Sequence, residues 1–181
     1  MGNPRRRLGL AAFVGFLACI PCANWLIQHV GTMCVPGGPC LVPVAPGVMA
    51  PSGVLTVGAA LVSRDLVQRC LGLRLGLIAV AAGTAASILL APPALVFASG
   101  AAFALSEIAD CAVYTPLQRR GLVRAVVASA MVGLVVDSVL FLWLAFGSLD
   151  FLAGQVIGKI WAVLIAIPLV RLMRHVTPAP A

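Results

Sequence analysis

Five polar side chains lie inside long apolar runs of the sequence, where we expect little access to water. Glu107 and Asp110 are three residues apart, so they share one face of a helix. Asp137 lies near the middle of the next apolar run, and Lys159 near the middle of the following one, with Gln155 one turn earlier on the same face. Left unpaired in hydrocarbon, the four charges would cost on the order of 10 kcal/mol. We therefore expect them to face one another or a wet cavity.

These three acids and one base leave a surplus of negative charge if all of them ionise. Either one or two carboxyls are protonated, or a cationic or hydrogen-bond-donating ligand completes the set. For Asp137 and Lys159 the alternative is an ion pair between helices that only fixes packing. Asp65 is expected to differ, because it stands beside Arg64 and one turn before Arg69 at a cytoplasmic helix end, where a solvated pair is the simpler interpretation.

Amides and indoles in the apolar runs are further candidates. Asn24 and Gln28 share a helix face, where they hydrogen-bond a neighbouring helix or read the edge of a planar ligand; the sequence leaves both open. Trp161 lies too deep in its run for the aromatic belt at the membrane interface, which favours packing or ligand contact.

The elements that hold these residues follow from composition. The 181 residues are 62% hydrophobic and 9% charged, with a mean hydropathy of +1.11, whereas a soluble globular protein has roughly 25% charged residues. Disordered chains are poor in apolar residues, so this composition excludes that class as well. The net charge of +7 comes from short basic clusters between apolar runs, which argues against a nucleic-acid-binding face. The sequence indicates a multi-pass, all-α membrane protein embedded in a lipid bilayer.

The apolar runs predict one transmembrane domain over residues 1–181. Its six helices are expected at about 8–30, 47–69, 74–91, 93–115, 124–146 and 151–173. Pro46, Pro51 and Gly53 crowd the start of the second helix.

Basic residues set the expected orientation. Eleven of the twelve fall before the first helix, between the second and third, between the fourth and fifth, or at the end of the sixth: Arg5, Arg6, Arg7, Arg64, Arg69, Arg74, Arg119, Arg120, Arg124, Arg171 and Arg174. The connections on the opposite side contain no Lys or Arg. The positive-inside rule then places both termini in the cytoplasm.

Cysteines divide by location. Cys34 and Cys40 lie in an outer loop, where an oxidising periplasm would allow a disulfide, the alternative being two free thiols. Cys19 and Cys22 lie inside an apolar helix with no second pair, so we expect buried apolar residues and no metal site.

Small residues at a spacing of four predict close helix packing. The two G-x-x-x-G pairs begin at Gly72 and Gly154. They suit a homodimer and packing within one chain equally well.

The fourth helix carries a motif that resembles a known family. Its run from Phe103 to Tyr114, FALSEIADCAVY, is similar to the SE-x-x-D-x-x-VY signature of the VUT group, the queuosine precursor transporters. The likeness continues, in order, over most of the chain: Ala23-Asn24, Pro51-Ser52-Gly53, Asp137-Ser138, Phe141, Gly154-Gln155 and Lys159. The segment 64–69 and the loop holding Cys34 and Cys40 depart from the family pattern.

This resemblance implies a six-helix importer of deazaguanine bases in the bacterial inner membrane. It implies a fold similar to the substrate-binding subunits of energy-coupling-factor vitamin transporters, with no cofactor and no ATPase domain in the chain. No P-loop motif occurs in the sequence. Energy would come from an ion gradient, a separate energising module, or metabolic trapping of the substrate.

The chemistry of a deazaguanine suits the polar residues. The flat base presents ring N–H and amino donors side by side, which a carboxylate such as Glu107 or Asp110 accepts, while Gln155 or Asn24 bonds the carbonyl. Asp137 and Lys159 would hold the cavity shape or respond to protons. Altogether the expected substrate contacts are Asn24, Ser106, Glu107, Asp110, Asp137, Gln155, Lys159 and Trp161.

Three other functions fit the sequence less well. A proton-coupled carrier or channel for another small solute would use the same buried charges. An intramembrane aspartyl enzyme would need two carboxyls sharing a proton, as Asp110 and Asp137 would if they met, but the other motifs of such proteases are missing. A structural membrane subunit would need no ligand at all.

Overall fold

The computed structural model describes residues 4–36, 38–91 and 93–173. In these ranges the chain forms six long helices: α1 (Pro4–His29), α2 (Val54–Leu71), α3 (Leu73–Leu90), α4 (Val96–Leu117), α5 (Leu122–Phe146) and α6 (Leu152–Met173). A single 3-10 turn, η1 (Pro93–Leu95), precedes α4. The protein is therefore an all-α bundle of the type that spans membranes, as the sequence predicts.

Length and composition separate the helices. Four of them are long and apolar enough to cross a membrane: α1, α3, α4 and α5. The apolar stretch of α6, Leu152–Pro168, is shorter than these four helices. The helix α2 carries Arg64, Asp65 and Arg69 within its 18 residues.

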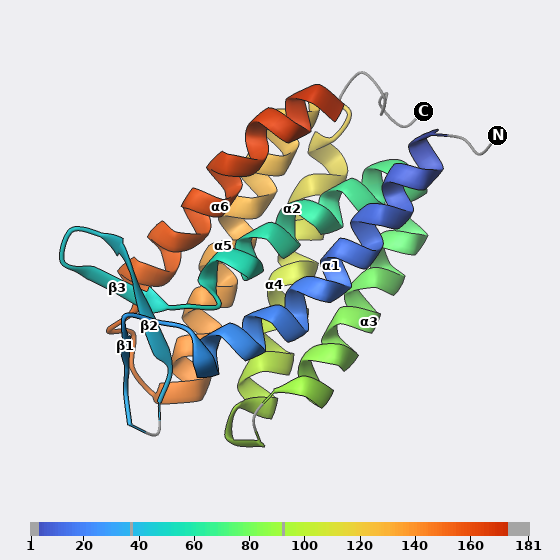
Figure 1. Ribbon diagram of the computed structural model, residues 1–181. Coiled ribbons are helices and arrows are strands. Elements are labelled where there is room, and N and C mark those ends of the chain that lie inside the picture. The colour runs from blue at the N-terminus through green and yellow to red at the C-terminus, as the bar shows by residue number, and fades with distance from the viewer. Residues whose placement is uncertain (1–3, 37, 92, 174–181) are drawn as a thin grey trace.

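The charged helix α2 lies at the centre of the bundle. It packs against all five other helices, most extensively against α1 and α6, and Figure 1 shows it between them. One apolar cluster joins Val67 and Ala60 of α2 to Phe16 of α1 and Ala79 of α3. A helix enclosed by protein need not present apolar residues to lipid, so α2 can carry charge where a peripheral helix cannot.

The second helix begins later than predicted. It starts at Val54 rather than near residue 47, because residues 48–51 form a strand instead. Pro46 and Gly47 make the turn before that strand, with Gly47 at a φ of +72°, and a Pro-Gly pair is a strong turn signal. Similarly, the fourth helix starts at Val96, after the 3-10 turn.

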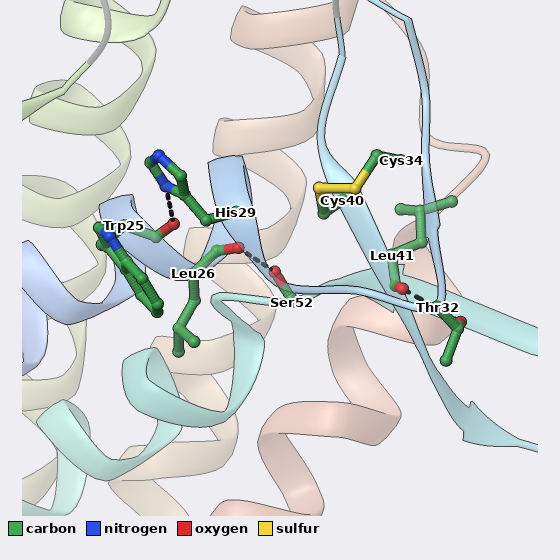
Figure 2. The surroundings of a disulfide bond; sticks show 8 residues. All are labelled: Trp25, Leu26, His29, Thr32, Cys34, Cys40, Leu41 and Ser52. Carbon is green, nitrogen blue, oxygen red and sulfur yellow. Dashed lines mark hydrogen bonds between the residues drawn. A yellow bond between two sulfur atoms is a disulfide. The ribbon is translucent and has the colours of Figure 1, made fainter.

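The outer connection is a small antiparallel sheet in the order β1-β2-β3. Its strands are β1 (Met33–Cys34), β2 (Cys40–Ala45) and β3 (Val48–Pro51). The disulfide between Cys34 and Cys40 joins β1 to β2, and Figure 2 shows that the Ser52 hydroxyl, next to β3, donates to the Leu26 carbonyl of α1 at 2.7 Å. The sheet is thereby fastened to the bundle.

The strands and the helix starts of α2, α4 and α6 lie at one end of the bundle, called the sheet end below. The first turn of α1 and the last turn of α6 lie together at the opposite end (Figure 1). Near that end Gly72 alone separates α2 from α3, at a φ of +92° that favours glycine. Arg174, one of the predicted cytoplasmic residues, lies outside the described residues.

Candidate functional site

A cavity opens inside the half of the bundle nearest the sheet. It holds about 820 Å³ of space between side chains, counted with its open mouth. Residues of all six helices line it, together with Pro51 of β3. Its polar wall consists of Asn24, Ser87, Ser99, Ser106, Glu107, Asp137 and Gln155. A largely apolar cavity with a few convergent polar groups is typical of a small-molecule site.

The apolar part of the wall suits a flat ring. Phe103 of α4 and Phe141 of α5 contribute aromatic side chains, and Ile20, Ile27 and Leu61 contribute branched aliphatic ones. Such surfaces bind the face of a ring by dispersion and exclusion of water, so that polar contacts remain for its edge.

Glu107 reaches the cavity from α4 and is held from behind by Arg64 of α2. The Arg64 Nε donates to Glu107 Oε2 at 3.0 Å, and Nη2 donates to the Glu107 carbonyl at 3.3 Å. Both side chains are buried, with at most 2% exposed. Among the described residues, no hydrogen bond engages the other carboxylate oxygen, Oε1, so Glu107 keeps an acceptor for a bound solute.

Asp110 lies behind the cavity wall. Its Oδ1 accepts a hydrogen bond of 2.6 Å from Arg64 Nη2, and the side chain is fully buried. Gly133 of α5 packs closely on it, since a Cβ at Gly133 would lie 3.1 Å from Asp110 Oδ2. The structure therefore places Asp110 with the residues that support Glu107, not with those that line the cavity.

Asp65 and Arg64 are not the solvated surface pair that the sequence suggests. Both side chains are fully buried in α2, and Arg64 Nη1 lies 3.2 Å from Asp65 Oδ1. Ser129 of α5 donates to Asp65 Oδ2 at 2.9 Å, and Arg64 Nη1 donates to Gln68 Oε1 at 3.0 Å. The expectation was wrong because Arg64 lies a full two turns before Gly72, where α2 ends, and α2 is surrounded by other helices.

Lys159 and Asp137 form a second ionic group between α6 and α5. Lys159 Nζ lies 2.5 Å from Asp137 Oδ2 and donates to Ser138 Oγ at 2.8 Å. Asp137 lines the cavity with 13% of its side chain exposed, whereas Lys159 is buried behind it. This arrangement repeats that of Glu107: an acid faces the cavity, and a base holds it from the protein side.

The amides differ in their surroundings. Gln155 and Asn24 both line the cavity, and in the described part of the chain no hydrogen bond engages either side-chain amide. Gln28 is instead exposed and donates to the Asn24 carbonyl within its own helix. Ser106 lines the cavity while its hydroxyl donates to the Phe103 carbonyl at 3.0 Å.

Trp161 is placed away from the cavity. Its side chain is half exposed, and its indole N–H donates to the Val44 carbonyl of β2 at 3.0 Å. It ties the sheet to α6, and the interpretation as a ligand contact is not supported. Of the eight predicted contacts, the structure brings five to the cavity: Asn24, Ser106, Glu107, Asp137 and Gln155.

Sequence reasoning missed Arg64, which organises the site. The signal was present, because Arg64 falls inside the predicted helix 47–69, five residues before its end. Within residues 4–36, 38–91 and 93–173, no group of three or more His, Cys, Asp or Glu side chains is arranged to hold a metal ion.

One comparison with known proteins gives a match. Residues 82–173 match a family described as "Putative vitamin uptake transporter". The matched segment runs from within α3 to the end of α6 and contains Glu107, Asp110, Asp137, Gln155 and Lys159. No curated protein and no solved structure matches the chain.

Proposed function

Because the chain belongs to this family of vitamin uptake transporters, we propose that it imports a deazaguanine base, a precursor of queuosine, across the bacterial inner membrane. Membership of the family makes it a multi-pass transporter of small molecules and not an enzyme. The proposal adds the substrate and the residues that bind it. The observation that carries it is a buried carboxylate, Glu107, in the wall of a largely apolar cavity.

Glu107 suits the edge of a guanine-like base. Such a base carries a ring N–H beside an exocyclic amine, and a carboxylate is the side chain that accepts two adjacent donors at once. Arg64 uses one acceptor position on Oε2, and a carboxylate has about four such positions. Glu107 is thus fixed by the protein and still able to accept both donors.

The remaining polar groups fit the rest of the base. A carbonyl stands next to the two donors, and the amide of Gln155 or Asn24 would donate to it; both line the cavity. Phe103 and Phe141 would contact the ring face. Asp137 would accept a hydrogen bond from an aminomethyl group, if the precursor carries one, while Lys159 holds Asp137 in place.

The test is uptake of a labelled deazaguanine by cells that cannot make it. We expect Glu107→Gln to lower uptake at least about tenfold, because a charge-assisted hydrogen bond contributes roughly 1.5–3 kcal/mol. Asp150→Asn is the matched control, since it is the same acid-to-amide change in an exposed outer turn, and it should leave uptake unchanged. Equal uptake by Glu107→Gln and the unmodified protein would reject the role of Glu107, and no uptake by the unmodified protein would reject the substrate.

A further inference from the structure

The guanidinium of Arg64 makes four hydrogen bonds and an ion pair with residues of two helices. Nε donates to Glu107 Oε2, and Nη2 donates both to the Glu107 carbonyl and to Asp110 Oδ1. Nη1 donates to Gln68 Oε1 and forms an ion pair with Asp65 Oδ1, 3.2 Å away. A guanidinium has five donors in one plane. Four hydrogen bonds to partners on α2 and α4, together with the ion pair to Asp65, hold that plane in place, so the Glu107 side chain is fixed relative to it.

From this geometry we infer that Arg64 is a positioning residue that sets which base edge the cavity accepts, an inference that rests on the proposed function. Arg64 itself does not line the cavity. It acts through Glu107, by donating to Oε2 from the protein side and favouring the ionised form of that carboxyl group.

Charge gives the physical reason. A guanidinium stays protonated in proteins, and a positive charge in contact with a carboxyl group favours its ionised form. Asp65 and Asp110 share this guanidinium and oppose ionisation of a third acid, so removing Arg64 would shift the buried Glu107 toward the neutral acid. The two forms present different patterns: a carboxylate has acceptors only, whereas a neutral acid has one O–H donor beside one acceptor.

These two patterns select different bases. The carboxylate matches two adjacent donors, as in 7-deazaguanine. It repels 7-deazaadenine, whose ring nitrogen presents a lone pair beside the amine, and it gains only one bond from 7-deazahypoxanthine, which lacks the exocyclic amine. A neutral acid pairs with the donor–acceptor edge of either of the latter two. Arg64 therefore makes the site selective for the two-donor edge.

The experiment measures equilibrium binding of these three bases to the purified, full-length protein in detergent. We expect the unmodified protein to bind 7-deazaguanine at least about tenfold more tightly than 7-deazaadenine, since unpaired polar groups in a binding site are strongly disfavoured. Arg64→Met should bring this ratio close to one or invert it. Arg64→Lys keeps the positive charge and should retain the preference with weaker binding overall.

Two further variants make the result specific. Glu107→Gln carries an amide with a donor beside an acceptor, so it should reproduce the altered ratio of Arg64→Met. Arg69→Met is the matched control on the same helix, because Arg69 Nη1 donates to the Gln118 carbonyl and not to Glu107; the ratio should stay at the unmodified value.

The outcomes separate the two proposals. An unmodified protein that prefers 7-deazaguanine, with the same preference in Arg64→Met and Glu107→Gln, would overturn the inference and the role of Glu107, and leave the proposed substrate intact. An unmodified protein that binds none of the three bases would overturn both. If Arg64→Met does not fold, the ratio of 7-deazaguanine to 7-deazaadenine affinity in Glu107→Gln tests the inference, and the same ratio in Arg64→Lys is the second measurement.

Discussion

In the described part of the chain, the buried acids pair with two basic residues, each placed between acids and the protein interior. Arg64 contacts Asp65, Glu107 and Asp110, and Lys159 contacts Asp137. Counting acids and bases along the sequence missed this division, because Arg64 was grouped with the basic residues between the second and third helices although it lies inside the predicted helix 47–69. The consequence for chemistry is that each cavity acid is already oriented before a solute arrives, which lowers the ordering cost of binding.

At this scale the ion pair of α5 and α6 gives a stability prediction. Lys159→Met should lower the free energy of unfolding by about 3–5 kcal/mol, because it leaves Asp137 without its base in a mostly buried position. The double variant Lys159→Met with Asp137→Asn should recover much of that loss. Denaturant unfolding in detergent measures both. Arg124→Met, at an exposed position, is the control and should change stability by about 0.5 kcal/mol or less; equal losses in the single and double variants would contradict the pairing.

At the scale of elements, α2 and α6 pack closely against each other at glycine residues. A Cβ at Gly58 would lie 2.6 Å from the Ala162 Cβ and 3.1 Å from the Lys159 carbonyl. The glycines of α6 are also used within the chain, since a Cβ at Gly158 would lie 2.7 Å from Val54. These small residues therefore join α6 to α2 and need no second copy of the chain to explain them.

Gly58→Val should accordingly separate α2 from α6 and lower the thermal unfolding temperature. Overpacking a tight contact destabilises by about 1–3 kcal/mol, and the displacement would also reach the Lys159 backbone. Gly15→Val on α1 is the matched control, because no atom lies within 4 Å of the Cβ it would add. Thermal unfolding of both variants in detergent tests this, and a Gly58→Val protein as stable as Gly15→Val would show that the contact is not tight.

Some elements of this fold can be predicted from the sequence more fully than others, depending on which residue pattern specifies them. Apolar runs long enough to span lipid identify the helices, because hydropathy is what lipid requires of α1, α3, α4 and α5. The sheet was missed because residues 31–46 were interpreted as a loop and residues 48–51 as the start of the second helix; the Pro46-Gly47 turn is the signal for a hairpin there. The cavity acids could be predicted because they lie in the middle of apolar runs. The role of Arg64 could not, because it depends on which helix lies at the centre of the bundle.

For the molecule as a whole, the two ends of the bundle differ in charge and in structure. Arg119 and Arg120 follow α4 at the end opposite to the sheet, and Arg74 begins α3 there. The cavity lies nearer the sheet end. If the arginine-bearing end faces the cytoplasm, the cavity lies toward the outer side of the membrane, as the disulfide-linked strands do.

Thiol labelling in intact cells tests this orientation. After reduction with a membrane-impermeant phosphine, an impermeant maleimide should label Cys34, because it lies at an exposed position of the sheet, whereas Cys40 is buried. An Arg119→Cys variant carries its new thiol at the opposite end and should be labelled only after lysis. Mass spectrometry of the labelled peptides distinguishes the sites. Labelling of Arg119→Cys in intact cells would show that the chain is inserted the other way round.

The central position of a charged helix also affects how the chain is made. Arg64 and its partner Glu107 are 43 residues apart, so α2 leaves the ribosome well before α4 can neutralise it. A helix with that charge would not partition into lipid alone at the translocon, and Gly72 joins it to α3 with no room for a loop. We expect α2 and α3 to insert as one hairpin, with Arg64 sheltered among α1, water and the translocon until α4 has been synthesised.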